Sequence, residues 1–143
     1  MASHVPRQLV AKFYRATDGA QPVDAFIEKQ TTAIQLAIDR QIDRINLLDE
    51  CHPHLAFPYS SQIEGELREL RTHYGNSLFR ILYRRSAQFI VLLHIFEKRD
   101  SKIPEAEKEI ARKRWADFQA RMEAKPRTQP GPIGKTAPPK KRR

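Results

Sequence analysis

The chain has 143 residues, a net charge of +9, 30% charged residues and 40% hydrophobic residues. That length supports one modest hydrophobic core and is short for two. The single cysteine, Cys51, excludes an internal disulfide, and the longest apolar run, at residues 89–96, is far shorter than the roughly 20 residues of a membrane-spanning helix. Residues 1–20 lack the apolar segment of a secretory signal, so we expect a cytoplasmic protein with no membrane segment.

The positive charge is concentrated at the carboxyl end of the sequence. Residues 124–143 hold seven of the 26 Lys and Arg residues, none of the 17 acidic residues and five of the ten prolines. This composition predicts a disordered basic tail after a folded domain at residues 1–123. Without the tail the domain has a net charge of only +2, so a basic site on it must be a local cluster. The tail either attracts nucleic acid or the ribosome by its charge, or is a plain solubilising segment.

The first half of the domain predicts one strand and a helical segment. Residues 5–16 alternate loosely between apolar and polar side chains, and the turn signal Asp18-Gly19 ends this strand. Pro22 suits the first turn of a helix. Residues 23–48 contain neither Gly nor Pro, and their apolar side chains recur at helical spacing. The polar break at residues 29–32 favours a hairpin of two helices over one long helix.

The second half predicts a sheet and a last helix. After a loop at residues 52–58, strand-like segments occur at about residues 65–74, 77–85 and 88–98, and the third is apolar on both faces, as a central strand is. Residues 104–123 have the apolar spacing of a helix. The predicted fold is α+β, a small antiparallel sheet of about four strands with an N-terminal helical hairpin and a C-terminal helix. We expect the helices to cover one face of the sheet and to leave the other face, or its rim, for function.

Strand alternation places several cations on one face of that sheet. Burial of Leu70 turns Arg71 to the opposite face, and the alternating apolar residues of segment 77–85 turn Arg80 and Arg84 the same way. In the third segment, Lys98 shares a face with His94 and Phe96. If that face joins the other two, then Arg71, Arg80 and Lys98 line one surface, with Arg99 and Lys102 at its rim. Such a surface can hold phosphates, which makes RNA the first partner to consider.

Several short motifs occur in a fixed order along the chain. They are Asp18-Gly19, Pro22-Val23, Phe26-Ile27, Glu69-Leu70-Arg71, Phe79-Arg80-Ile81-Leu82-Tyr83, the run from Val91 to Arg99, and Lys102-Ile103-Pro104 before a helix with Ala111-Arg112. None is specific alone, but their order and spacing resemble the RelE/ParE toxin superfamily and, within it, the phage-derived HigB-like branch. The resemblance spans roughly residues 10–120, nearly all of the domain.

The resemblance implies the toxin of a type II toxin–antitoxin module, held by an antitoxin that is typically a helix-turn-helix protein. Most RelE-like and HigB-like members cut mRNA in the ribosomal A site without a metal or another cofactor. ParE-like members instead poison DNA gyrase and cut nothing. The implied function is therefore a ribosome-dependent mRNA endonuclease. The alternatives are a gyrase-binding toxin and a diverged phage or mobile-element module that only binds RNA or protein.

Cleavage of RNA by its own 2′-hydroxyl needs cations around the phosphate, a base and an acid. By resemblance, Arg80 and Arg99 match arginines of the superfamily. The expected catalytic residues are Arg71, Arg80, Lys98 and Arg99, and the expected substrate-binding residues are Lys102, Arg84, His73 and His94. His73, His94 and Lys98 are the candidates for base and acid. RelE-like nucleases often carry a tyrosine past the last arginine, but here Ile103-Pro104-Glu105 occupies that region.

Each assignment has a structural alternative. Arg71 and Arg80 can pair with Glu64, Glu66 or Glu69 across strands. The cations from Lys98 to Lys102 can form an ordinary solvated rim, His94 can be a hydrogen-bonded core histidine, and His73 can be merely exposed. Cys51, His52 and His54 lack the spacing of a closed zinc site, so we expect no metal.

Overall fold

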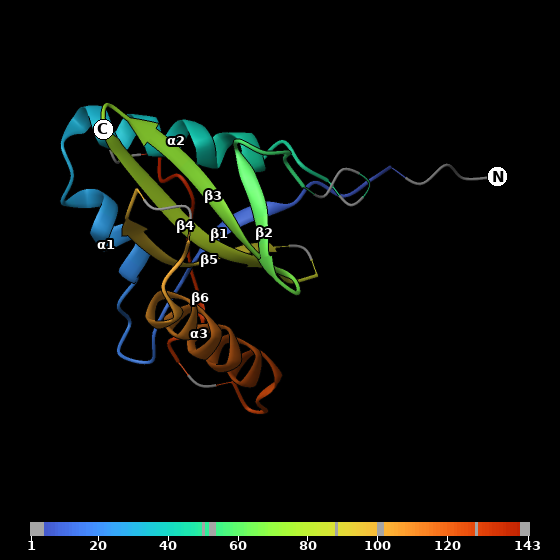
Figure 1. The fold of residues 1–143 in the computed structure, drawn as a ribbon. Helices are drawn as coiled ribbons and strands as arrows, with labels where there is room; N and C mark the ends of the chain where they lie inside the picture. Colours follow the sequence, from blue (N-terminus) through green and yellow to red (C-terminus); the bar gives the residue numbers. More distant parts are fainter. Residues whose placement is uncertain are drawn as a thin grey trace.

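The computed structural model describes residues 5–49, 51, 54–87, 89–99, 102–127 and 129–140. The elements in chain order (Figure 1) are β1 (Val10–Tyr14), α1 (Pro22–Glu28), α2 (Thr32–Ile45), β2 (Ser60–Glu64), β3 (Leu67–Tyr74), β4 (Ser77–Arg85), β5 (Phe89–Glu97), α3 (Glu105–Glu123) and β6 (Ile133–Thr136). The strands form one sheet in the order β2-β3-β4-β5-β1-β6. β1 runs parallel to β5, and the other neighbours are antiparallel. The expected α+β class is confirmed, with more strands than expected.

Several expected features touch residues outside the described ranges. His52 and Pro53 of the expected loop and Gln88 at the expected start of the third strand lie outside them, as do Thr128 and residues 141–143 of the expected tail. Within the described ranges, no helix has both the length and the apolar character needed to cross a bilayer.

The N-terminal helical segment is a hairpin of α1 and α2, as the polar break predicts. Pro22 lies in the first turn of α1, where a missing backbone N–H breaks no helical hydrogen bond. Thr31 caps α2, because its side-chain oxygen accepts a hydrogen bond from the backbone N–H of Ile34 at 3.3 Å. The polar residues between the helices therefore end one helix and start the next.

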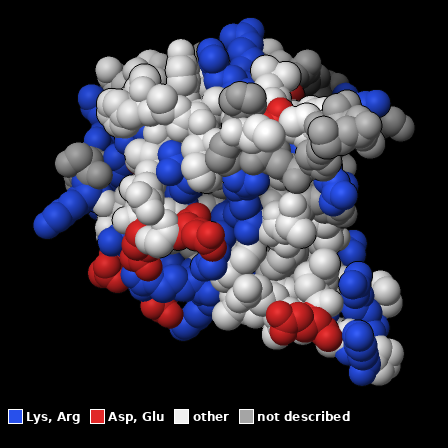
Figure 2. Space-filling model, turned by 90° about the vertical axis from the view of Figure 1, so that its right-hand side faces the viewer, with Lys and Arg blue, Asp and Glu red and all other residues white. Residues whose placement is uncertain are grey.

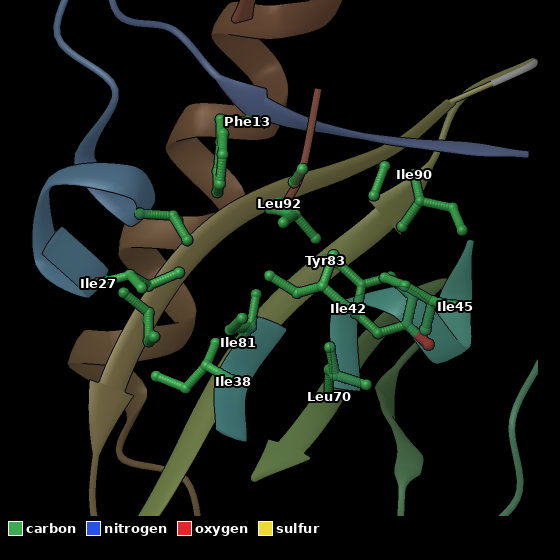
Figure 3. Packing of buried hydrophobic residues seen from close by; sticks show 14 of the residues in the cluster. Phe13, Ile27, Ile38, Ile42, Ile45, Leu70, Ile81, Tyr83, Ile90 and Leu92 are labelled. Carbon is green, nitrogen blue, oxygen red and sulfur yellow. The ribbon is translucent and has the colours of Figure 1, made fainter. Parts of the chain in front are cut away.

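One face of the sheet packs on α1 and α2 (Figure 3). Ile38, Ile42 and Ile45 of α2 are fully buried and share a cluster with Leu70 of β3 and Ile81 of β4. These α2 residues recur every three to four positions, so a single apolar stripe of the helix faces the sheet.

The opposite face packs on α3, so the expectation that all helices cover one face is wrong (Figure 1). Ala111, Trp115 and Phe118 of α3 form a second buried cluster with residues that include Leu82 of β4 and Leu93 of β5. Strands β4 and β5 are largely buried on both faces. A strand that is apolar on both faces needs cover on both, and α3 supplies the second layer.

The two strands at the edges of the sheet, β2 and β6, were not expected from the sequence. β2 pairs antiparallel with β3. β6 pairs with β1, although its residues belong to the segment that composition assigned to a disordered tail. The expectation of disorder is thus wrong for residues 133–136. Strands of four or five largely polar residues carry too little alternation to be recognised from sequence.

Hydrogen bonds to the interior of the fold hold the segment around β6. The side chain of Asn46 accepts from the N–H of Ala11 at 2.9 Å and donates to the carbonyl of Ala137 at 2.7 Å. Ala137 is fully buried, and its N–H donates to the carbonyl of Ala11 at 2.9 Å. The prolines do not prevent this pairing, because neighbouring residues supply the backbone donors.

A second attachment joins this segment to the end of α3. Arg121 donates to the carbonyl of Pro130 at 3.1 Å and to the carboxylate of Asp117 at 2.7 Å. The hydroxyl of Tyr14 in β1 donates to the same carboxylate at 2.5 Å. Burial, together with the neighbouring Asp117 carboxylate, raises the pKa of Tyr14 to about 12. The residue therefore stays a neutral hydrogen-bond donor at ordinary pH.

We predict that Gly134→Ala destabilises the fold by about 1–3 kcal/mol, the usual cost of overpacking. A Cβ atom at position 134 would lie 2.8 Å from the carbonyl oxygen of Phe13 and would also collide with the side-chain oxygen of Gln21. Gly131→Ala is the matched control, because its Cβ would meet only Arg15 at 4.0 Å. Urea denaturation measures both variants, and equal stabilities would show that β6 does not contribute to the folded domain.

Candidate functional site

The cations that strand alternation placed together do share one face of the sheet, the face that α3 partly covers. Arg71 of β3 is the direct cross-strand neighbour of Arg80 in β4, and Arg80 is the neighbour of Phe96 in β5. Phe96 belongs to the buried cluster under α3. The backbone N–H of Lys98, just past β5, donates to the carbonyl of Leu78 at 3.0 Å. The strand pairing therefore continues far enough to bring Lys98 to the same end of the sheet.

One buried carboxylate lies between the two arginines. Glu69 Oε2 is 3.3 Å from Arg71 Nη1, and Glu69 Oε1 is 3.2 Å from Arg80 Nε. The hydroxyl of Ser61 in β2 donates to Glu69 at 2.5 Å, which fixes the carboxylate from the edge of the sheet. The structural alternative, in which Arg71 and Arg80 pair with a carboxylate, is therefore correct for Glu69. Glu64 instead pairs with Arg112, and Glu66 pairs with Arg84. Glu69 therefore bridges the two guanidinium groups.

Arg80 and Arg71 differ in what they present to solvent. The side chain of Arg80 has no exposed surface. It therefore positions other residues of the site and does not contact a ligand in this conformation. Arg71 is partly exposed and stacks under the ring of Phe57, with 5.2 Å between the guanidinium carbon and the ring centroid. Phe57 is 68% exposed. It lies in a proline-containing loop without periodic apolar residues, so no pattern in the sequence indicates that it would lie beside Arg71.

Two open hollows flank the end of β5. The first, of about 220 Å³, is lined by Arg71, His73 and Arg99 together with the β3–β4 turn. The second, of about 430 Å³, is lined by Lys98, Lys102 and the start of α3, with both Glu105 and Lys108. Within the described residues, no carboxylate lies at ion-pair distance from Lys98, Arg99 or Lys102. We call Arg71, Lys98, Arg99 and Lys102 the cation surface. Because three of these four cations have no carboxylate partner within the described part of the chain, the surface is suited to an anion.

Arg84 and His94 lie elsewhere, against α3. Arg84 pairs with Glu66 at 3.0 Å and stacks on Trp115, with 4.6 Å between its guanidinium carbon and the ring centroid. His94 Nε2 lies 3.0 Å from a carboxylate oxygen of Glu107. These two residues, expected to bind substrate, line neither of the two hollows beside β5. The alternative of a hydrogen-bonded core histidine describes the place of His94.

Burial lowers the pKa of His94, and the nearby Arg114 guanidinium lowers it further, while Glu107 partly opposes both. The folded protein therefore resists protonation of this ring more than the unfolded chain does. Among the described residues, no group of three or more His, Cys, Asp or Glu side chains is placed to hold a metal ion.

A comparison with protein families matches residues 25–116 to the model described as phage-derived protein Gp49-like (DUF891). The matched segment is more than half of the chain and contains β2 to β5, so it includes Glu69, Arg71, Arg80 and Lys98. This family is associated with RelE-like, toxin-like proteins. No curated protein matches the chain.

We predict that Glu69→Gln costs about 3–5 kcal/mol of stability, as expected when one partner of a buried ion pair is removed. The change leaves Arg71 and Arg80 facing each other without a negative charge between them. Glu66→Gln is the control, because Glu66 is 78% exposed in its pair with Arg84 and such pairs contribute at most about 1 kcal/mol. The free energy of unfolding of both variants is measured by chemical denaturation. Equal losses in the two variants would contradict this description.

We also predict that His94 makes stability fall with acidification. Because its folded-state pKa is lowered, the unfolded chain binds the proton first, so the free energy of unfolding decreases as pH falls through about 6.5 toward the folded-state pKa. His94→Asn should flatten the urea-denaturation profile between about pH 7.5 and 5.5. If the His94→Asn variant keeps the wild-type dependence of unfolding free energy on pH, His94 is not the cause of that dependence.

Proposed function

We propose that this chain, which belongs to the phage-derived Gp49-like family, is the toxin of a type II toxin–antitoxin pair and cuts mRNA on the ribosome without a metal. The association of the family with RelE-like proteins supports a toxin-like module. On the order of its motifs, we propose that the chain is of the HigB-like branch. The observation that carries the proposal is the cation surface, where cations from β3 and from the segment after β5 lie around two hollows on one face. Its excess charge matches the phosphates of RNA.

The residues of the site fall into two groups, those that contact the phosphate and those that position the contacting residues. Arg71, Lys98, Arg99 and Lys102 can reach a phosphate, and cations that face it stabilise the charge that develops in the transition state. Arg80 is a positioning residue, because it is fully buried and acts through Glu69 on Arg71. The exposed ring of Phe57 beside Arg71 offers a platform on which an unpaired base can stack.

In the proposed reaction the 2′-oxygen of RNA bonds to the adjacent phosphorus and the bond from phosphorus to the 5′-oxygen breaks. A base removes the proton of the 2′-hydroxyl, and an acid returns a proton to the 5′-oxygen. His73 is better placed than His94 for one of these roles, because it lines the same hollow as Arg71 and Arg99. An imidazole can accept or donate a proton near neutral pH. Lys98 is the candidate for the other role.

A non-enzymatic toxin that binds gyrase is the second candidate, and one observation favours it. The segment between β5 and α3 contains Ile103 and Pro104 and no tyrosine, and the last tyrosine of the chain is Tyr83. A supercoiling assay with the purified protein separates the two functions, because a ribosome-dependent nuclease leaves gyrase active. A diverged module that only binds RNA or protein would cause no growth defect when its expression is induced.

A toxin-like protein implies an antitoxin that restrains it, and we propose a helix-turn-helix protein encoded beside this chain. Co-expression with the product of the neighbouring reading frame should restore growth and yield a complex that purifies together. Growth arrest that persists despite expression of that product would reject it as the partner.

We predict that Lys98→Gln relieves growth arrest and lowers mRNA cleavage about tenfold or more, because one cation that faces the phosphate is lost. Mapping of the 5′ ends of cellular mRNA after induction measures the cleavage. Lys113→Gln is the matched control, since Lys113 is exposed on α3 and lines neither hollow. Unchanged mRNA during arrest by the wild type would reject the nuclease, and equal cleavage by both variants would remove Lys98 from the site.

A further inference from the structure

A larger cavity lies at the other end of the sheet. It has a volume of about 570 Å³, and its lining comes from the β2–β3 turn, the start of β3 and the end of β4. Figure 1 shows these turns together at one end of the sheet, away from the β3–β4 turn that borders the cation surface. We call this space, lined by His54, Arg68 and Arg85 among others, the turn-end cavity.

The turn-end cavity also opens on the other face of the sheet. Arg68 is the cross-strand neighbour of Tyr83, and Tyr83 belongs to the buried cluster under α1 and α2. Strand alternation puts Arg85 on the same side as Tyr83. Arg68 and Arg85 therefore lie on the opposite face of the sheet from Arg71.

The positive charge of this cavity comes from two arginines that no described carboxylate pairs with. Within the described ranges, no carboxylate lies at ion-pair distance from Arg68 or Arg85. Glu66 also lines the cavity, but its carboxylate bonds Arg84 at 3.0 Å. Figure 2 views the molecule from this end and shows Lys and Arg side chains gathered in the middle of the face, beside an acidic group.

The side chain of Arg68 is fixed at the wall of the cavity. One terminal nitrogen donates to the carbonyl of Leu55 at 3.3 Å, which holds the side chain in place. The guanidinium group that lines the cavity is therefore held in place for an anion to bind it.

The pKa of His54 responds to the positive charges of the same cavity. Burial lowers its pKa most, Arg68 and Arg85 lower it further, and Glu66 opposes them. These are the charged groups that face the ring. An anion between the two arginines would offset their effect, so the pKa of His54 should rise when the cavity is filled.

We propose that the turn-end cavity binds a phosphate group through the guanidinium groups of Arg68 and Arg85, with His54 at its rim. Paired guanidinium donors suit phosphate oxygens because they combine charge with directed hydrogen bonds. The volume falls in the range of small-ligand sites, so it accommodates more than a lone phosphate. The phosphate belongs to a free nucleotide or to an RNA strand. This site is separate from the cation surface, and the proposal does not depend on RNA cleavage.

The test is titration of the full chain with inorganic pyrophosphate by calorimetry, with His54 followed by NMR. We expect saturable binding, a rise in the pKa of His54, and binding weakened about tenfold by Arg85→Gln, which removes charge-assisted hydrogen bonds. Arg40→Gln removes the same charge from an exposed position on α2 and should bind as the wild type does. Arg68→Gln adds a second test if it folds.

Absence of saturable binding at millimolar pyrophosphate would overturn the proposal. Equal weakening by Arg85→Gln and Arg40→Gln would also overturn it, because it would show a general effect of charge. Titrations with a mononucleotide and with a short RNA identify the source of the phosphate. Weakening of mononucleotide binding by Arg85→Gln supports a free nucleotide, and weakening of RNA binding alone supports a strand. If Arg85→Gln weakens neither, the cavity is not a phosphate site.

Discussion

The arrangement of the molecule depends on two central strands that are buried on both faces. β4 and β5 need cover above and below, which α2 with α1 supplies on one side and α3 on the other. α3 begins only at Glu105, after Pro104, and its first turn forms one wall of the hollow beside Lys98. The point at which α3 begins therefore decides which part of the sheet stays open. The cation surface lies where this cover ends.

The second constraint is electrostatic. The domain before residue 124 is nearly neutral, so a phosphate-binding surface has to be built locally. At the open end of the sheet, the carboxylate of Glu69 contacts both Arg71 and Arg80 and holds Arg71 in position. Lys98, Arg99 and Lys102 beside it have no carboxylate at ion-pair distance within the described residues, so they supply the attraction for an anion.

Sequence patterns predicted much of this arrangement where the physical signal is local. Two-residue alternation correctly put Arg71 beside Arg80, and the polar break at Thr31 correctly divided the helices. Other features depend on tertiary contacts. The side of the sheet that α3 covers follows from packing, and β6 exists because Asn46 and β1 supply partners for a proline-rich segment.

Sequence patterns predicted the candidate functional site with the same limits. Alternation gives the direction of a side chain but not its depth, so it could not show that Arg80 is fully buried or that His94 is bonded to Glu107 beneath α3. Phe57 and His54 lie in an irregular loop and come close to the sheet only through the fold. Arg68 and Arg85 lie on the face that the N-terminal helices were expected to cover, so strand alternation did not point to them as site residues.

The central claim is that RNA binds on the side of the sheet that α3 partly covers, at the end of β5. The most direct measurement is an NMR titration of the full chain with a short RNA whose 2′-oxygens are methylated, so that it cannot be cut. The account predicts that signals of Arg71, Phe57, Lys98 and Arg99 shift together and saturate with one affinity. Saturable shifts confined to other parts of the chain, or no shifts in this group, would contradict it.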